Sequence, residues 1–161
     1  LYTYAVSGTG LTAEQQLHVG NTSANGIFVG VPAFDPAVGL VYVGNPNANG
    51  NYAHGLNALQ QNTGCAGLTL AWKASIGGAN VTSDDNQAPS VANGVVYFTD
   101  GIDNKLWAFN AASGAQLWNS GTSIGAPCSA YGTVCGVYGA ATIDGRVFVG
   151  SWNHKLYAFG L

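Results

Sequence analysis

The stretch NGVVYFTDGIDNKLWAFNAASGAQLW, residues 93–118, carries the clearest structural pattern in the chain. Two apolar runs, residues 95–99 and 106–109, are separated by the polar segment 100–104, and an Ala-Ser-Gly turn leads to a last short run ending at Trp118. Short runs rich in Val, Tyr, Phe and Trp between Gly, Asn, Asp and Ser turns are typical of antiparallel strands joined in sequence order. Helical spacing is absent. The stretch therefore predicts a β-meander.

The same pattern recurs at intervals of about 50 residues. A frame of Leu-x-Ala-(Leu/Phe) stands at residues 56–59, 106–109 and 156–159, and residues 1–4 fit as an earlier copy. Self-similarity at a fixed period indicates a repeat architecture in which each unit is one supersecondary element. We therefore treat the chain as a series of related units.

Two further columns accompany this frame. Before it stands an apolar run introduced by a glycine-bearing turn, with the runs at 41–43, 96–98 and 147–149 and the glycines at Gly39, Gly94 and Gly145. After it comes a run from a glycine to an aromatic residue, at 10–18, 64–72 and 114–118. His18 stands where the other two copies carry Trp.

Each unit thus supplies four short strands, and the innermost and least regular strand is expected around residues 27–33, 88–91 and 137–143. Four strands per unit at this period are typical of a β-propeller blade. The strands read as continuous apolar runs, as expected when both faces of each sheet are covered. A β-sandwich with coincidental spacing is the alternative.

The units resemble the repeats of the pyrroloquinoline-quinone-binding-like (quinoprotein-type) β-propeller family. The family's turn and closing tryptophan, roughly A-x-D-x-x-T-G-x-x-x-W, are approached by residues 108–118, where Asn110 replaces Asp, Ser113 replaces Thr and the Gly-to-Trp interval is one residue shorter. The family's hairpin S-x-D-G-x-L-Y-A-L/F is approached by residues 151–159. The resemblance covers nearly the whole chain. It implies a fold rather than an activity, because the same repeat serves dehydrogenases and non-catalytic scaffolds.

The units divide the chain into one all-β propeller region, residues 1–161, that forms a partial ring. We expect residues 1–18 to end one blade, residues 20–76 and 79–124 to form two complete blades, and residues 126–161 to supply three strands of a last one. Closed propellers usually need at least four blades. We therefore expect the chain to be the C-terminal part of a longer propeller, with ring closure between identical copies as the alternative.

Composition excludes two classes of partner. Charged residues make up 7% of the chain, the net charge is −3, and only four side chains are basic. Such a surface has too few cations to track nucleic acid phosphates, so nucleic acid is not an expected partner. No apolar run approaches the ~20 residues of a membrane helix, so no membrane span is expected.

The three cysteines bear on the compartment. Cys128 and Cys135 flank a Ser/Gly/Thr-rich loop at a spacing that a local disulfide closes, and Cys65 is then the odd one out. A disulfide suits an oxidising compartment, so we expect a secreted or periplasmic protein. A reduced pair of small buried residues is the alternative. Zinc is not expected, because no CxxC motif or histidine pair accompanies the cysteines.

Candidate ligand-binding residues lie in loops that a four-stranded meander places on one rim, where loops concentrate function. They are Asp84, Asp85, Asn86, Asp103, Tyr131, Trp152 and His154, with His54, Asp100 and Asn104 on the same rim. The acidic cluster at residues 84–86 suits a hard cation such as calcium or simply caps its loop. Trp152 either stacks on a sugar or quinone or packs on a neighbouring blade. No metal site is assigned, and no nucleophile–base–acid set can be identified.

Two functional hypotheses follow, with a third as a variant. The preferred one is a non-catalytic, extracytoplasmic binding or assembly scaffold whose partners are other blades, a protein or a glycan. The alternative is the C-terminal portion of a quinoprotein alcohol or sugar dehydrogenase, for which the resemblance implies pyrroloquinoline quinone (PQQ) and calcium as cofactors. The family's adjacent cysteine pair is missing, so catalysis is not the favoured hypothesis. A sugar-binding propeller is the third.

Overall fold

The computed structural model describes residues 1–19, 30–76, 88–101, 103–125 and 139–160, and its regular structure is almost entirely β. A single 3-10 turn at Thr63–Cys65 is the exception in the described part. The predicted all-β class is therefore confirmed. None of the helices described is long and apolar enough to cross a membrane, in agreement with the expectation from sequence.

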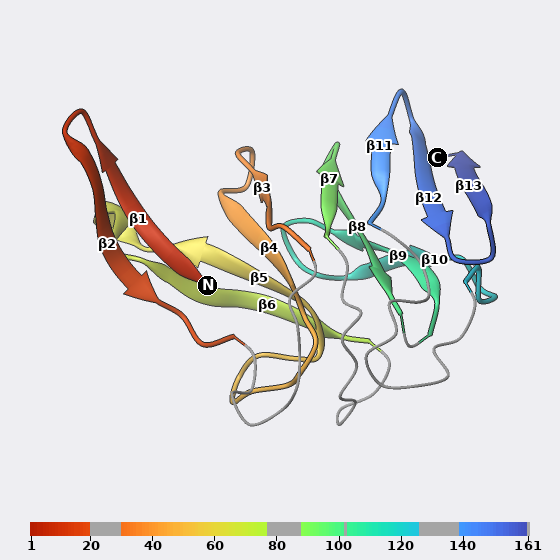
Figure 1. The fold of residues 1–161 in the computed structure, drawn as a ribbon, viewed down its shortest axis with the longest axis horizontal. Coiled ribbons are helices and arrows are strands. Elements are labelled where there is room, and N and C mark those ends of the chain that lie inside the picture. Colours follow the sequence, from red (N-terminus) through yellow and green to blue (C-terminus); the bar gives the residue numbers. More distant parts are fainter. Residues whose placement is uncertain (20–29, 77–87, 102, 126–138, 161) are drawn as a thin grey trace.

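Thirteen strands are described, and they form four antiparallel sheets that follow one another along the chain (Figure 1). Sheet 1 is the hairpin of β1 (Tyr2–Ser7) and β2 (Gly10–Gln16). Sheet 2 contains β3 (Ala33–Asp35), β4 (Leu40–Asn45), β5 (Gly55–Gln61) and β6 (Leu68–Ser75). Sheet 3 contains β7 (Ser90–Ala92), β8 (Val95–Asp100), β9 (Lys105–Asn110) and β10 (Gln116–Asn119). Sheet 4 contains β11 (Ala141–Ile143), β12 (Arg146–Ser151) and β13 (Lys155–Gly160).

The first strands of sheets 2, 3 and 4 are only three residues long. The strands β3 and β7 end beyond the predicted ranges 27–33 and 88–91, whereas β11 lies within the predicted range 137–143. In sheets 3 and 4 a two-residue turn fixes them: Asn93-Gly94 and Asp144-Gly145 have positive φ at both positions. Turns with positive φ at both central residues match the twist of paired strands, which is why Asn-Gly and Asp-Gly favour hairpins. Only the residues directly before each turn therefore pair with the second strand.

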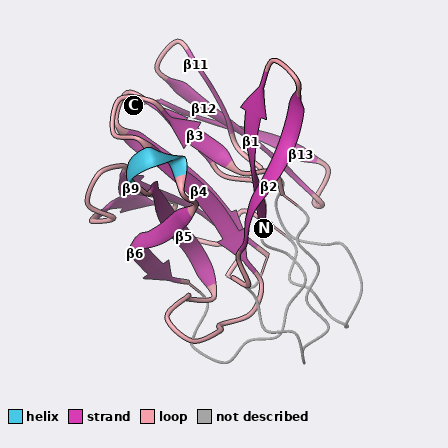
Figure 2. Ribbon diagram, turned by 90° about the vertical axis from the view of Figure 1, so that its left-hand side faces the viewer, coloured by secondary structure: helices cyan, strands magenta, loops and turns pink. Residues whose placement is uncertain are grey.

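The sheets pack face to face in a row, seen from the side in Figure 1 and from the sheet 1 end in Figure 2. Alternate residues of one strand enter opposite interfaces. In β8, Val96 and Phe98 pack against sheet 2, whereas Tyr97 packs against sheet 4. A third cluster joins sheet 2 to sheet 1 through Val43 and Leu1. Because both faces of a sheet are covered, its strands need not alternate apolar and polar residues. Each large apolar side chain that is buried contributes about 1.5–3 kcal/mol to the stability of the fold.

The outermost strands of sheets 1, 2 and 3 contain the same irregularity. Ala58 pairs with Trp72 and Leu59 with Leu70, so one residue of β6 is left over in a bulge. β10 is shifted at the corresponding place, and so is β2, where Thr3 pairs with Gln15. Gln15 thus occupies the position of Trp72 and Trp118. The alignment of His18 with these tryptophans is wrong, because the pairing register, and not the distance from a glycine, sets the position.

The side chains after the bulges of β6 and β2 each contact a turn of the next sheet. The Trp72 indole N–H donates a hydrogen bond to the Ala111 carbonyl (2.9 Å), and the Tyr42 hydroxyl donates to the same oxygen (3.0 Å). The ring lies on Gly114, whose φ is +72° and where a Cβ would come within 2.6 Å of two ring carbons. Gly114 therefore serves both a left-handed turn and a close approach.

Gln15 repeats this contact between sheets 1 and 2 without an aromatic ring. Its Oε1 accepts a hydrogen bond from the Leu68 N–H (2.6 Å), and its Nε2 donates to the Leu68 carbonyl (3.3 Å). Gly67, with φ +90°, leaves room for this side chain as Gly114 does for Trp72. A side chain resting on a turn glycine of the following sheet is thus a repeated device.

Replacing Gly114 by alanine should destabilise the protein more than the same change at Gly94. Both residues have φ above +70°, so both variants incur about 1–2 kcal/mol for a left-handed side chain. Only at Gly114 does the new Cβ also overlap the Trp72 ring; at Gly94 nothing lies within 4 Å. Overpacking of this kind adds about 1–3 kcal/mol. Urea denaturation of both variants gives the difference, and equal losses would contradict the proposed contact.

Candidate functional site

The predicted site residues fall into two groups. Asp84, Asp85, Asn86 and Tyr131 lie outside the described residues, as do Cys128 and Cys135. Asp103 lies in the turn between β8 and β9, and Trp152 and His154 lie in the turn between β12 and β13. In sheets 2 and 4 the turn between the second and third strands lies at the lower end of its own sheet in Figure 1, opposite the turn between the first and second strands.

Asp103 and His154 have local roles in their hairpins. Asp103 Oδ1 accepts a hydrogen bond from the Lys105 N–H (3.1 Å), and Oδ2 accepts one from the Trp107 indole (2.9 Å). His154 has φ +64°, and its N–H donates to the Ser151 carbonyl (3.1 Å). Polar side chains that bond to nearby backbone in this way stabilise turns. Trp152 is 43% exposed in the same turn.

Asp103 approaches a buried histidine of the neighbouring sheet. His54, on the β4–β5 connection, is almost completely buried, and its Nδ1 lies 2.5 Å from the Ile76 carbonyl and 3.9 Å from Asp100 Oδ2. Its Nε2 is buried and makes no hydrogen bond to any described residue. The imidazole is therefore assigned as neutral, with Nδ1–H donating to Ile76.

Burial shifts the pKa values of His54 and Asp103. Burial lowers the pKa of His54, and the hydrogen bond to Ile76 and the charge of Asp103 offset this only in part. Burial likewise raises the pKa of Asp103, against the opposing effects of its bonds to Lys105 and Trp107. Desolvation disfavours whichever form is charged, which is why the two shifts have opposite signs.

The rim polar groups hold the chain where it leaves each sheet. His54 bonds Ile76 after β6, and the Asn104 carbonyl accepts from Ile124 N–H after β10 (2.8 Å). The Asn153 side chain donates to the Ile124 carbonyl (3.0 Å). The described residues contain no group of three His, Cys, Asp or Glu side chains placed to hold a metal. These hydrogen bonds hold the chain near Ile76 and Ile124 to the rim.

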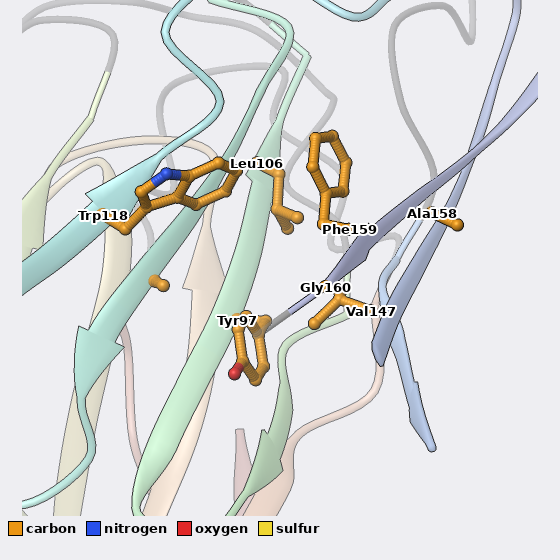
Figure 3. Close-up of a pocket in the computed structure, with 8 residues that line it drawn as sticks. Tyr97, Leu106, Trp118, Val147, Ala158, Phe159 and Gly160 are labelled. Carbon is orange, nitrogen blue, oxygen red and sulfur yellow. The ribbon is translucent and has the colours of Figure 1, made fainter. Parts of the chain in front are cut away.

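An apolar pocket of about 390 Å³ lies between sheets 3 and 4 (Figure 3). Trp118, Leu106 and Phe159 gather at one end of it, and the Trp118 and Phe159 rings meet edge to face with centroids 5.4 Å apart. The remaining lining residues are Tyr97, Ala108, Val147, Ala158 and Gly160. A small cavity of about 110 Å³ lies between the first turns of the same two sheets, beside Arg146.

The large pocket corresponds to a filled region between sheets 2 and 3. Pairing makes Trp118 equivalent to Trp72 and Gly160 equivalent to Asn110. Ala111 and Gly114, which follow Asn110, cover Trp72. The equivalent of Ala111 is Leu161, which lies outside the described residues. Among the described residues Trp118 is 44% exposed. A tryptophan that recurs with the repeat frame is expected to pack in the core, and the exposure of Trp118 differs from that expectation.

Both ends of the row of sheets expose apolar side chains. Leu156 of sheet 4 is 72% exposed, although its equivalents Leu56 and Leu106 are completely buried. At the other end, Val6 of sheet 1 is 81% exposed and Leu11 is also exposed. Leu156 thus occupies a position that a neighbouring sheet covers elsewhere in the row.

Comparison with known proteins leaves the function open. No family model matches the sequence, and no curated protein matches it. Among solved structures 32 chains are similar, including one described as "Crystal structure of the computationally designed Ika4 protein". That chain is 9% identical, with a TM-score of 0.44, covering 91% of this chain and 99% of its own. The resemblance to quinoprotein-type repeats stays a prediction.

Acidification should destabilise the protein through His54. The unfolded histidine has a pKa of about 6.5, and the folded pKa is lower. Below about pH 6.5 the unfolded state therefore binds a proton that the folded state excludes, and stability is lost by up to about 1.4 kcal/mol per pH unit. The raised pKa of Asp103 acts with the opposite sign, at the lower pH where carboxylates titrate.

The measurement is the free energy of unfolding between pH 7 and pH 5.5 for the parent and for His54→Asn, which carries the side chain found at position 104. In His54→Asn, the dependence of the free energy of unfolding on pH should lose the contribution of the histidine. His154→Asn, a change at an exposed position, is the matched control and should leave the slope intact. Equal slopes for the parent and His54→Asn would show that His54 does not titrate as argued.

Proposed function

We propose that the chain is a non-catalytic β-propeller scaffold module, acting outside the cytoplasm, that assembles with other polypeptides through the ends of its row of sheets. Each sheet is a blade in this proposal. The observation that carries it is the repetition of one interface: a side chain after a bulge rests on a turn glycine of the next sheet, once at Gly67 and once at Gly114.

The order of the inner strands supports the blade interpretation. β7 lies next to β3 on one side and β11 on the other, so the shortest strands of three sheets adjoin one another. Strands that surround a common axis lie closest at their inner ends, as in propellers. In this arrangement the outer strands, which lie farther from the axis, contain the bulges and make the contacts between sheets.

The exposed end faces support an assembly role. Leu156 occupies a position that is buried in both preceding sheets, and Val6 and Leu11 expose apolar surface at the opposite end. Contiguous apolar surface on a folded protein marks an interaction site. Because the interior interfaces show what such a face packs against, the proposed partner surface is another β-sheet face.

A catalytic role finds less support in the described residues. Under the quinoprotein hypothesis, the acidic side chains that this chain could contribute are those of Asp84, Asp85 and Asp103. Asp103 Oδ1 and Oδ2 accept hydrogen bonds from Lys105 and Trp107 within its own hairpin. This engagement favours a structural carboxylate, while Asp84 and Asp85 lie outside the described residues.

Light scattering of the purified chain tests the assembly role. We expect a concentration-dependent mass above the 16.4 kDa of one copy, or capture of a second sheet-bearing chain when that chain is added. Leu156→Asp should abolish association, because it places a charge in a face that must lose water. Leu117→Asp, a change at an exposed leucine of the β10 bulge, is the control and should not.

A parallel assay separates the dehydrogenase hypothesis. The chain is mixed with PQQ, calcium, an alcohol or aldose and an artificial electron acceptor. The scaffold proposal predicts no acceptor reduction above the protein-free rate. A strictly monomeric chain that reduces the acceptor would overturn it.

A further inference from the structure

The outer edge of β13 differs from the corresponding edges of the other sheets. In sheets 1, 2 and 3 the strand that carries the Leu-x-Ala frame or its early copy pairs with an outermost strand: β1 with β2, β5 with β6 and β9 with β10. In the described part of sheet 4, β13 pairs only with β12. Its second edge therefore offers backbone groups for a further strand, and such an edge is a template for pairing.

The pocket beside this edge lies at the place that a turn covers in the preceding interface. It runs from Trp118 to Gly160, across the site where Ala111 and Gly114 cover Trp72 in the preceding interface. The lining is apolar, and the Trp118 ring is half exposed within it. The edge and the pocket are therefore two parts of one incomplete interface.

We propose that this edge and pocket bind an extended peptide segment, which adds to β13 as a fourth antiparallel strand. The segment has the chemistry of β6 and β10: a turn glycine, a short uncharged strand and a tryptophan. Main-chain hydrogen bonds to β13 supply affinity, and the pocket selects the side chains, as in other cases of strand addition.

The established sheets give the register of the added strand. Ala58 pairs with Trp72 and Ala108 with Trp118, so the tryptophan of the segment pairs with Ala158. Its glycine then lies on the Trp118 ring, where a side chain would collide as it would at Gly114. One extra residue precedes the tryptophan, forming the bulge that β6 and β10 contain.

This inference rests on the proposed blade architecture, but it concerns an edge rather than an end face. Leu156 is absent from the pocket lining. Assembly through the end faces and capture of a strand can therefore be tested separately. Leu156→Asp tests assembly, and Trp118→Ala tests strand capture.

The probe is the synthetic peptide Ala-Ser-Gly-Ala-Gln-Leu-Trp-Asn, the sequence of residues 112–119, labelled with fluorescein at its N-terminus. Its anisotropy is followed as the intact 161-residue protein is added. We expect a saturable rise, and binding at least about tenfold weaker with Trp118→Ala, since buried tryptophans dominate such contacts. Trp152→Ala is the control, because Trp152 is 43% exposed against 44% for Trp118 but lies outside the pocket; it should change affinity less than twofold.

If the protein variant Trp118→Ala does not fold, changes in the peptide still test the proposal. With the protein unchanged, the peptide changes Gly114→Val and Trp118→Ala should each weaken binding at least about tenfold, because the turn glycine and the tryptophan are the selected groups. A scrambled peptide should not bind. No saturable rise at protein concentrations up to about 1 mM would overturn the proposal, as would equal binding of the parent and scrambled peptides or equal effects of the two protein variants. Light scattering of Leu156→Asp, measured separately, shows whether assembly fails with it or survives alone.

Discussion

The contact of Trp72 with the turn at residues 111–114 is the constraint on which the relation between sheets depends. One carbonyl, that of Ala111, accepts hydrogen bonds from both Trp72 and Tyr42, and the missing Cβ of Gly114 lets the ring lie on the backbone. Directional bonds and a steric fit together permit one placement of sheet 3 on sheet 2. Between sheets 1 and 2, Gln15 makes the corresponding contact at Gly67 with hydrogen bonds and without an aromatic ring.

A row of sheets joined in this way explains the unusual composition. Interior sheets bury both faces, so the strands need no charged face, and only 7% of the chain is charged. Because every sheet follows the same apolar pattern, the outward faces of the first and last sheets in the row also carry apolar side chains. Leu156 is exposed because its frame position is apolar throughout the repeat, and the repeat does not distinguish an interior sheet from a terminal one. The proposed assembly at the ends would use the same kind of sheet-to-sheet contact that builds the interior.

Local signals in the sequence predicted more of the fold than of the site. Asn93-Gly94 and Asp144-Gly145 predict their hairpins from local sequence, because the positive φ angles belong to the turn itself. The equivalence of Gln15 with Trp72 was missed, because a bulge is defined only by pairing with another strand. Asp103 was expected to face a ligand, yet Trp107, four residues away, engages it. The pocket at Trp118 lies between two sheets and depends on how they pack, which the repeat frame does not record.

Position 54 and its equivalents show where function is to be sought in a repeat of this kind. His54, Asn104 and His154 directly precede the third strands of sheets 2, 3 and 4. The carbonyls of His54 and Asn104 each accept a hydrogen bond from the isoleucine that follows the last strand of the same sheet. Sheet 4 has no described strand after β13, and His154 is exposed. The same position is thus structural twice and accessible once. Exposure, and not the residue type, therefore distinguishes position 154 from its two equivalents. This difference is the reason for proposing interaction surfaces at the edges and ends of the row.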